Sequence, residues 1–141
     1  MIDPERALQR GLIDHLRGDA ALKALLGDPA RIWDQPPEKP LYPYLVLGRL
    51  EARSLEGLAG GLEQALTLTC VSRFGGAEEA KAVTAAVRAR LHDADLTLEA
   101  HRLVSAAVTY SDVFRGADWR STYGVVRLRA VTEPLIEEEA A

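Results

Sequence analysis

The sequence has few of the residues from which enzymes and metal proteins build their sites. Its 141 residues include one cysteine and three histidines. One thiol cannot form an internal disulfide, and it excludes a cysteine-based metal centre. The chain has no apolar run of the about 20 residues that a transmembrane helix takes, and its first residues lack the apolar stretch of a secretory signal. These absences favour a single globular domain that folds in a reducing cytoplasm.

The charge of the chain is also low. Lysine and arginine number 17 against 21 acidic residues, which gives a net charge of −4. Four of the acids lie near the C-terminus, at Glu133, Glu137, Glu138 and Glu139, and without them the charges balance. A neutral body has no basic field with which to hold nucleic acid, so specific DNA binding is not expected. Residues 134–141 are predicted to be an acidic, flexible tail.

Three segments are predicted to be helices. Asp3 suits the N-cap of the first, and Leu8, Leu12 and Leu16 recur on one face of it. A second short helix is expected over residues 20–26, between an aspartate and a glycine that suit its two ends. A third begins after Gly75-Gly76 and ends at His92-Asp93, with two glutamates in its first turn and a buried apolar stripe.

Four longer segments alternate residue types with the period of a β-strand. They cover residues 44–52, 64–73, 102–114 and 119–132. The first two are joined by the glycine-containing loop 53–63 and the last two by a turn, so each pair forms a hairpin. Residues 31–33 suit a short edge strand. The order helix, hairpin, helix, hairpin predicts an α+β fold, with an antiparallel or mixed sheet of about four main strands and helices packed on one face.

The alternation also predicts which side chains share a face of the sheet. In the third long strand, Val104, Ala106, Val108 and Tyr110 are expected on one face. In the second, Cys70 is expected on the core face, where it acts as a small hydrophobic residue.

No group of residues in the sequence supports catalysis. His15, His92 and His101 stand in no ligand motif such as HExxH. Gly75-Gly76 precedes a helix, but it lacks the lysine and hydroxyl residue of a phosphate-binding loop. We therefore predict no enzyme activity and no catalytic, cofactor-binding or metal site.

The last long strand carries the most unusual pattern. Trp119 opens the predicted strand, and Tyr123, Arg127 and Arg129 share the face opposite the core. If helices cover the other face, these side chains lie on the open side of the sheet. Arginine beside tryptophan and tyrosine is typical of interface anchors, and a solvated antiparallel face explains the pattern equally well.

The loop 53–63 is the second unusual feature. It holds Leu55, Leu58 and Leu62, which form no periodic face. It is either a disordered hairpin tip or an arm that becomes ordered against a neighbouring copy or a partner.

The ordered series of motifs resembles the tail completion, or tail terminator, proteins of long-tailed bacteriophages and phage-derived gene transfer agents. The likeness covers residues 5–133, which we take, with the first residues, as one domain, 1–133. The motifs that carry it are Asp19-Ala20-Ala21-Leu22, Arg31-Ile32-Trp33-Asp34, Pro43-Tyr44-Leu45-Val46-Leu47-Gly48, Leu66-Thr67-Leu68-Thr69-Cys70-Val71-Ser72-Arg73, Gly76-Ala77-Glu78-Glu79-Ala80 and Tyr123-Gly124-Val125-Val126-Arg127-Leu128-Arg129.

This resemblance implies a structural role without enzyme activity or cofactor. Such proteins have an α/β sandwich-like fold and form a hexameric ring that caps the tail tube, ends its polymerisation and meets the head connector. The implied partners are other copies of the chain, the tail tube protein and the connector or neck protein, with DNA passing through the lumen without specific binding and no membrane contact. The implied location is the head-proximal end of the tail, after assembly in the bacterial cytoplasm. The loop 53–63 lacks an expected tryptophan, so no residue role is carried over to it.

Two other functions stay open from the sequence. One is a head–tail connector or neck protein of the same particle, and the other is a small α+β ligand-binding domain or enzyme. For a ring, the candidate subunit or tube interface consists of Trp119, Tyr123, Arg127, Arg129, Leu55, Leu58 and Leu62. The balanced charge predicts a neutral to acidic lumen, because a basic one would hold the DNA phosphates.

Overall fold

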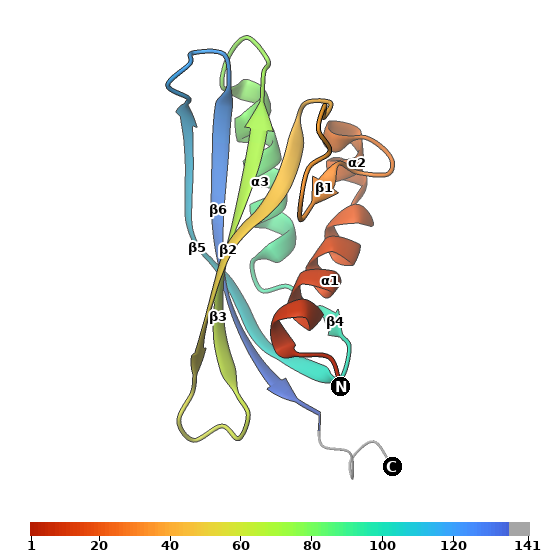
Figure 1. The fold of residues 1–141 in the computed structure, drawn as a ribbon, viewed down its shortest axis with the longest axis vertical. Helices are drawn as coiled ribbons and strands as arrows, with labels where there is room; N and C mark the ends of the chain where they lie inside the picture. The colour runs from red at the N-terminus through yellow and green to blue at the C-terminus, as the bar shows by residue number, and fades with distance from the viewer. Residues whose placement is uncertain (136–141) are drawn as a thin grey trace.

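The computed structural model describes residues 1–135, and three helices lie beside a long, curled sheet (Figure 1). The helices are α1 (Pro4–Arg17), α2 (Ala20–Leu26) and α3 (Glu78–Leu91). The strands are β1 (Ile32–Trp33), β2 (Tyr44–Ser54), β3 (Leu62–Ser72), β4 (Thr97–Leu98), β5 (His101–Arg115) and β6 (Thr122–Pro134). Most of the predicted acidic tail, residues 136–141, lies outside the described residues. In residues 1–135, no helix is both long and apolar enough to cross a membrane.

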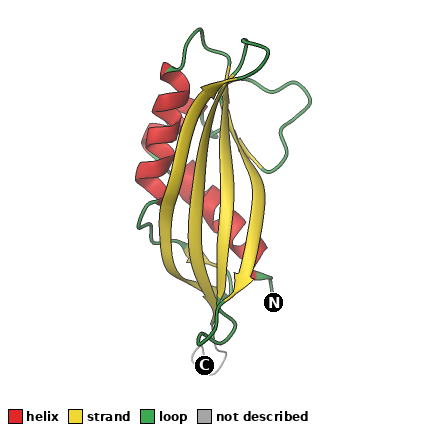
Figure 2. Cartoon of the chain, turned by 90° about the vertical axis from the view of Figure 1, so that its left-hand side faces the viewer, coloured by secondary structure: helices red, strands yellow, loops and turns green. Residues whose placement is uncertain are grey.

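Over residues 1–135, the sheet has six strands in the order β1-β2-β3-β6-β5-β4. Only β1 and β2 pair in parallel, and the other pairs are antiparallel. The helices cover one face, and Figure 2 shows the strands of the other face in front of them. We call the uncovered side the open face. The α+β class is confirmed, and the short edge strand expected at residues 31–33 is present as β1. The expected four main strands and simple helix–hairpin order were incomplete, because β4 has two residues and carries no periodic pattern.

Helices α1 and α2 begin where the sequence predicted. The carboxylate of Asp3 accepts the N–H of Arg6 at 2.8 Å, and that of Asp19 accepts the N–H of Leu22 at 3.0 Å. Both bonds satisfy amides that the helix leaves free at its N-terminus. The core between helices and sheet is aliphatic, and its fully buried side chains include Leu8, Leu12, Leu16, Leu22, Leu26, Leu45, Leu66, Leu68, Leu91 and Leu128.

The predicted face pattern of β5 was partly wrong, because the strand has two irregularities. The register shifts between Leu103 and Ser105 and again between Val108 and Tyr110. An inserted residue reverses the alternation beyond it. Val108 consequently packs against the core, whereas Tyr110 lies opposite Arg127 on the open face.

The two hairpin connections also differ from the prediction. The strand β6 begins at Thr122, so Trp119 lies in the preceding turn, with a positive φ of 58°. The carboxylate of Asp118 builds this turn by accepting the N–H groups of Arg120 (2.9 Å) and Ser121 (3.1 Å). The same bonds lower the pKa of Asp118. The other connection is shorter than predicted, since it covers residues 55–61 and Leu62 already belongs to β3.

Candidate interaction surface

The aromatic residues all lie outside the core. The chain has two tryptophans, four tyrosines and two phenylalanines, and each is exposed or half-buried in the structure. Trp119 is 75% exposed and Phe74 is 59% exposed. Aromatic side chains are the largest apolar groups a protein can bury, so leaving all of them outside an aliphatic core indicates a surface made for binding.

Most of these side chains gather at one end of the sheet. Tyr44, Tyr123 and Phe114 stand in a single row across the strands, with Val71 between the tyrosines. The rings of Phe114 and Tyr123 are 5.7 Å apart between centroids. We define the aromatic end by the residues Trp33, Tyr42, Tyr44, Arg73, Phe74, Phe114, Arg115, Trp119 and Tyr123; it is uppermost in Figure 1.

Arginines stack on the aromatic rings of this surface. The guanidinium of Arg73 lies 4.7 Å from the centroid of the Tyr42 ring, and that of Arg115 lies 5.6 Å from the ring of Trp119. Each cation is attracted by the negative face of the ring. Arginine and aromatic side chains together are the residue types most often found at interface hot spots.

Tyr123, Arg127 and Arg129 lie on the open face, as predicted. The guanidinium of Arg127 is 4.9 Å from the centroid of the Tyr110 ring, and that of Arg129 donates to the Glu63 carboxylate at 3.1 Å. Trp119 lies in the turn before β6, at the aromatic end of the sheet, and not in the strand itself. Tyr42, Tyr44 and Phe114 were not among the predicted interface residues. The sequence does carry one signal for them: no predicted helix contains an aromatic residue, which indicates an aliphatic core.

The predicted leucines lie at the opposite end of the molecule, lowest in Figure 1. We define the hairpin tip as residues 55–61 together with Leu62. Its backbone is held by the N–H of Leu55 donating to the carbonyl of Gly61 (3.1 Å) and the N–H of Gly61 donating to that of Leu58 (2.8 Å). The three leucines are half-buried. The structure therefore separates them from the aromatic end.

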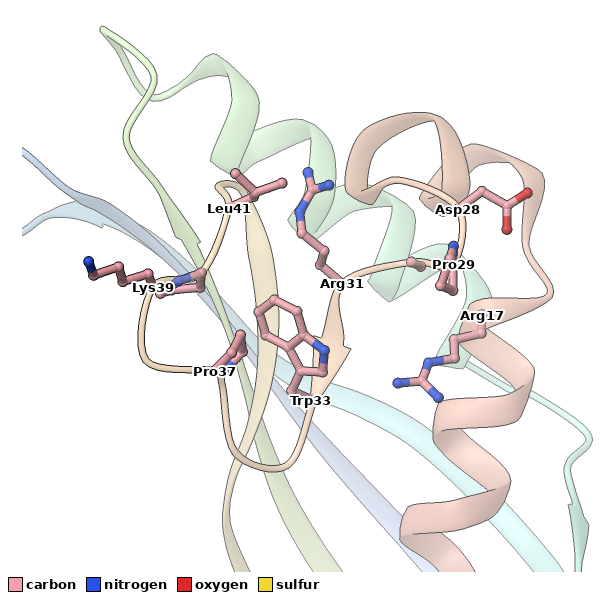
Figure 3. Close-up of a pocket in the computed structure, with 10 residues that line it drawn as sticks. Arg17, Asp28, Pro29, Arg31, Trp33, Pro37, Lys39 and Leu41 are labelled. Atoms are coloured by element: carbon pink, nitrogen blue, oxygen red, sulfur yellow. The ribbon is translucent and has the colours of Figure 1, made fainter.

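A pocket of about 500 Å³ lies between residues 34–43, a connector with four prolines, and the α2–β1 turn (Figure 3). Two of its arginines hold the backbone around it. The Arg31 Nε donates to the carbonyl of Pro43 at 2.9 Å, and the Arg17 guanidinium donates to that of Ile32 at 2.8 Å. Trp33 lines the same pocket. Arg31 stabilises the end of the connector and Arg17 stabilises β1, so these pocket arginines have a structural explanation.

Cys70 is buried in the core, and two of the histidines contact backbone carbonyls. Burial, with a smaller effect of the nearby Glu79 carboxylate, raises the pKa of Cys70 to about 12. The Nε2 atoms of His15 and His101 lie at hydrogen-bond distance from the carbonyls of Arg90 and Ile2. Over residues 1–135, no three His, Cys, Asp or Glu side chains are grouped as metal ligands. The core position predicted for Cys70 is confirmed.

The comparisons with known proteins agree with the sequence resemblance. Residues 10–133 match the family described as Tail completion protein gp17. A chain of the solved structure "Virion of native gene transfer agent (GTA) particle" is 29% identical, with a TM-score of 0.85, covering 94% of this chain and 99% of that chain. A second solved structure, 14% identical with a TM-score of 0.55, covers 94% of this chain and 93% of that one, and shares the fold alone. No curated protein matches the chain.

An α+β domain that keeps its aromatic residues on the surface fits a structural protein of a larger assembly. The chain belongs to the tail completion protein gp17 family. It is a structural protein of a phage-type virion tail.

Proposed function

We propose that the protein closes into a hexameric ring on the finished tail tube, ends its polymerisation and forms the surface that joins the head connector. Membership in the tail completion family supports this role. The observation that carries it furthest is the likeness, at a TM-score of 0.85 over nearly the whole chain, to a chain of a gene transfer agent virion. In this proposal the protein stands at the head-proximal end of the tail and acts by its shape, without a cofactor or a catalysed reaction.

The two ends of the molecule suit two different neighbours. The aromatic end and the hairpin tip lie at opposite ends of the long strands (Figure 1). Suppose that the copies of a ring stand side by side and that their long strands run from one rim of the ring to the other. The aromatic ends then form one rim, and the hairpin tips form the opposite rim. We propose that one rim binds the tail tube and the other binds the head connector. At one rim, the contact is supplied by Trp119, Tyr123 and the two arginines of the aromatic end, Arg73 and Arg115. At the other rim, it is supplied by Leu55, Leu58 and Leu62.

Negative-stain images of the purified protein mixed with tail tubes test this function. The expected result is a ring on one end of each tube, together with tubes that no longer grow when free tube protein is added. Bare tube ends, with the protein bound instead to isolated head connectors, would contradict the proposal and assign the chain to the neck of the particle.

A further inference from the structure

Within the part of the chain that the structure describes, two stretches of the sheet's edges have no neighbouring strand. At one edge, β1 pairs with β2 only at Leu45 and Val46. Among the described residues, no other strand borders β2 on that side. Residues 48–54 therefore keep an open backbone edge, and almost all of them are exposed. We call this segment the β2 free edge.

The opposite edge is open over a different stretch. The two residues of β4 pair with the first two residues of β5. Further along, the N–H of Asp93 donates to the carbonyl of Ala106 at 2.9 Å, and the N–H of Val108 donates to Nδ1 of His92 at 3.2 Å. Within residues 1–135, no strand or loop backbone covers this side of residues 109–115. We call this segment the β5 free edge.

An open strand edge is a row of unpaired N–H and C=O groups, which is a template for pairing with another chain. We propose that the β2 free edge of one copy pairs with the β5 free edge of the next, so that the sheets join around the ring into one continuous barrel. The inference rests on the proposed function, because it takes the ring as given and names the contact that closes it.

The strand directions fit this contact. The four long strands alternate in direction in the order β2, β3, β6, β5, so β2 and β5 run in opposite directions. Copies related by rotation about a ring axis keep the same orientation. The β5 strand of one copy therefore meets the β2 strand of the next in the antiparallel sense, and the alternation continues across the boundary.

The two free edges lie at different heights in the sheet, and the offset sets the tilt of the joined strands. Asp112 of the β5 free edge lies opposite Val125 of β6. Arg53 of the β2 free edge lies, through Glu63 of β3, in the row of Val131 of β6. Along the strands, these rows are six residues, or about 20 Å, apart. Across the strands, one copy takes up four strand spacings, or about 19 Å. Pairing Arg53 with Asp112 therefore tilts the strands by about 45° from the ring axis. Closed barrels have strands tilted by about 35–45°.

Charge selects this register over the neighbouring one. A slip must be of two residues if each side chain is to stay on its face of the sheet. One other register keeps the strand tilt within the range of closed barrels: it places Glu51 opposite Asp112 and tilts the strands by about 35°. That register sets two carboxylates against each other, whereas Arg53 and Asp112 form a pair of opposite charge.

The direction of the offset places the open face inside the barrel. Helix α3 connects β3 to the parallel strand β5 in the right-handed sense that such crossovers take (Figure 1). Viewed from the helix side with β5 running upward, the β5 free edge is therefore at the upper right and the β2 free edge at the lower left. Joining them winds the strands in a right-handed coil when the helices are outside, which is the hand that strand twist favours. With the helices inside, the coil would be left-handed.

Disulfide cross-linking between neighbouring copies tests this contact. In the variant Arg53→Cys with Asp112→Cys, each boundary brings two thiols together on the same face of the sheet, within the Cα separation of about 4.4–6.8 Å that a disulfide takes. After mild oxidation of capped tails, we expect loss of the monomer band on a non-reducing gel and a ladder that ends at the closed ring. Cys70 stays reduced because it is buried.

The matched control is Arg53→Cys with Ser111→Cys, whose second thiol is on the opposite face and should leave the protein monomeric on the gel. Charge reversal gives a second readout. Arg53→Asp and Asp112→Arg should each reduce ring formation, and the two together should restore it. Tails that are capped by the protein while the Arg53→Cys, Asp112→Cys pair gives only monomer would overturn the edge contact and leave the proposed function standing. Tube ends that stay bare with the unmodified protein would overturn both.

Discussion

Cys70 is the one thiol of the chain, and its side chain is 1% exposed on the core face of β3. Burial raises its pKa to about 12, so the neutral thiol is the folded form below that pH and the reactive thiolate is scarce. We predict that a thiol reagent at pH 8 labels Cys70 slowly in the native protein and rapidly in guanidinium chloride. Equal labelling rates in both conditions would contradict the buried position of Cys70.

Trp119 is the most exposed aromatic side chain of the chain. Because it is 75% exposed, Trp119→Ala should change the free energy of unfolding by no more than about 0.5 kcal/mol. If the aromatic end binds another component of the particle, the same variant should weaken that attachment by about 2 kcal/mol, or about 30-fold.

Co-sedimentation with tail tubes and with head connectors measures this attachment. The matched control is Val104→Ala. It removes an exposed apolar side chain from the first half of β5, which begins beside β4 and lies away from the aromatic end. Unchanged binding of both components by the Trp119 variant would remove the turn 116–121 from the contact.

Among the helices and strands, α3 packs closely against the sheet at Gly124 of β6. A Cβ atom there would lie 2.3 Å from Oγ1 of Thr84 and 3.2 Å from the carbonyl of Ala80, both on α3. Gly124→Ala should therefore push α3 from the sheet and cost about 1–3 kcal/mol of stability. The midpoint of urea unfolding measures the loss, and Gly75→Ala, where a Cβ meets nothing within 4 Å, serves as control. Equal midpoints for the two variants would show that α3 does not pack this closely.

The sequence predicted those elements whose patterns are regular. The leucine spacing of α1 and its aspartate cap were sufficient, because local periodicity and capping decide where a helix starts and which face it buries. The irregularities of β5 were not predictable, since Val108 and Tyr110 alternate in the sequence as an unbroken strand would. The turn expected at residues 115–118 is present, but it continues to Ser121. Its length was not predictable, because the bonds that extend it, from Arg120 and Ser121 to the Asp118 carboxylate, depend on how the backbone folds around that side chain.

For the molecule as a whole, the open face has nearly balanced charge. Arg129 is paired with Glu63, and Arg102 is paired with Glu133. If this face lines the channel, the lumen offers few free cations to the DNA phosphates. We predict that the isolated ring does not retain duplex DNA in a filter-binding assay at about 0.15 M salt, where the Debye length is about 8 Å. Tight retention at that salt concentration would contradict a neutral lumen.

The candidate surface was only partly predictable, because it combines residues distant in the sequence. Tyr123 and Arg127 followed from the alternation of one strand. Tyr44 and Phe114 join Tyr123 only through the order of the strands in the sheet, which single-strand patterns do not contain. The open edges depend in the same way on the short strands β1 and β4, which leave parts of β2 and β5 uncovered.

The length of the tails gives the sharpest test of the proposed capping role. Electron micrographs of particles made with and without this gene give the length distribution of the tail tubes. We expect uniform tails with the protein present, and tubes of variable, extended length with no heads attached when it is missing. Tails of unchanged length, joined normally to heads in the absence of the protein, would contradict the capping role.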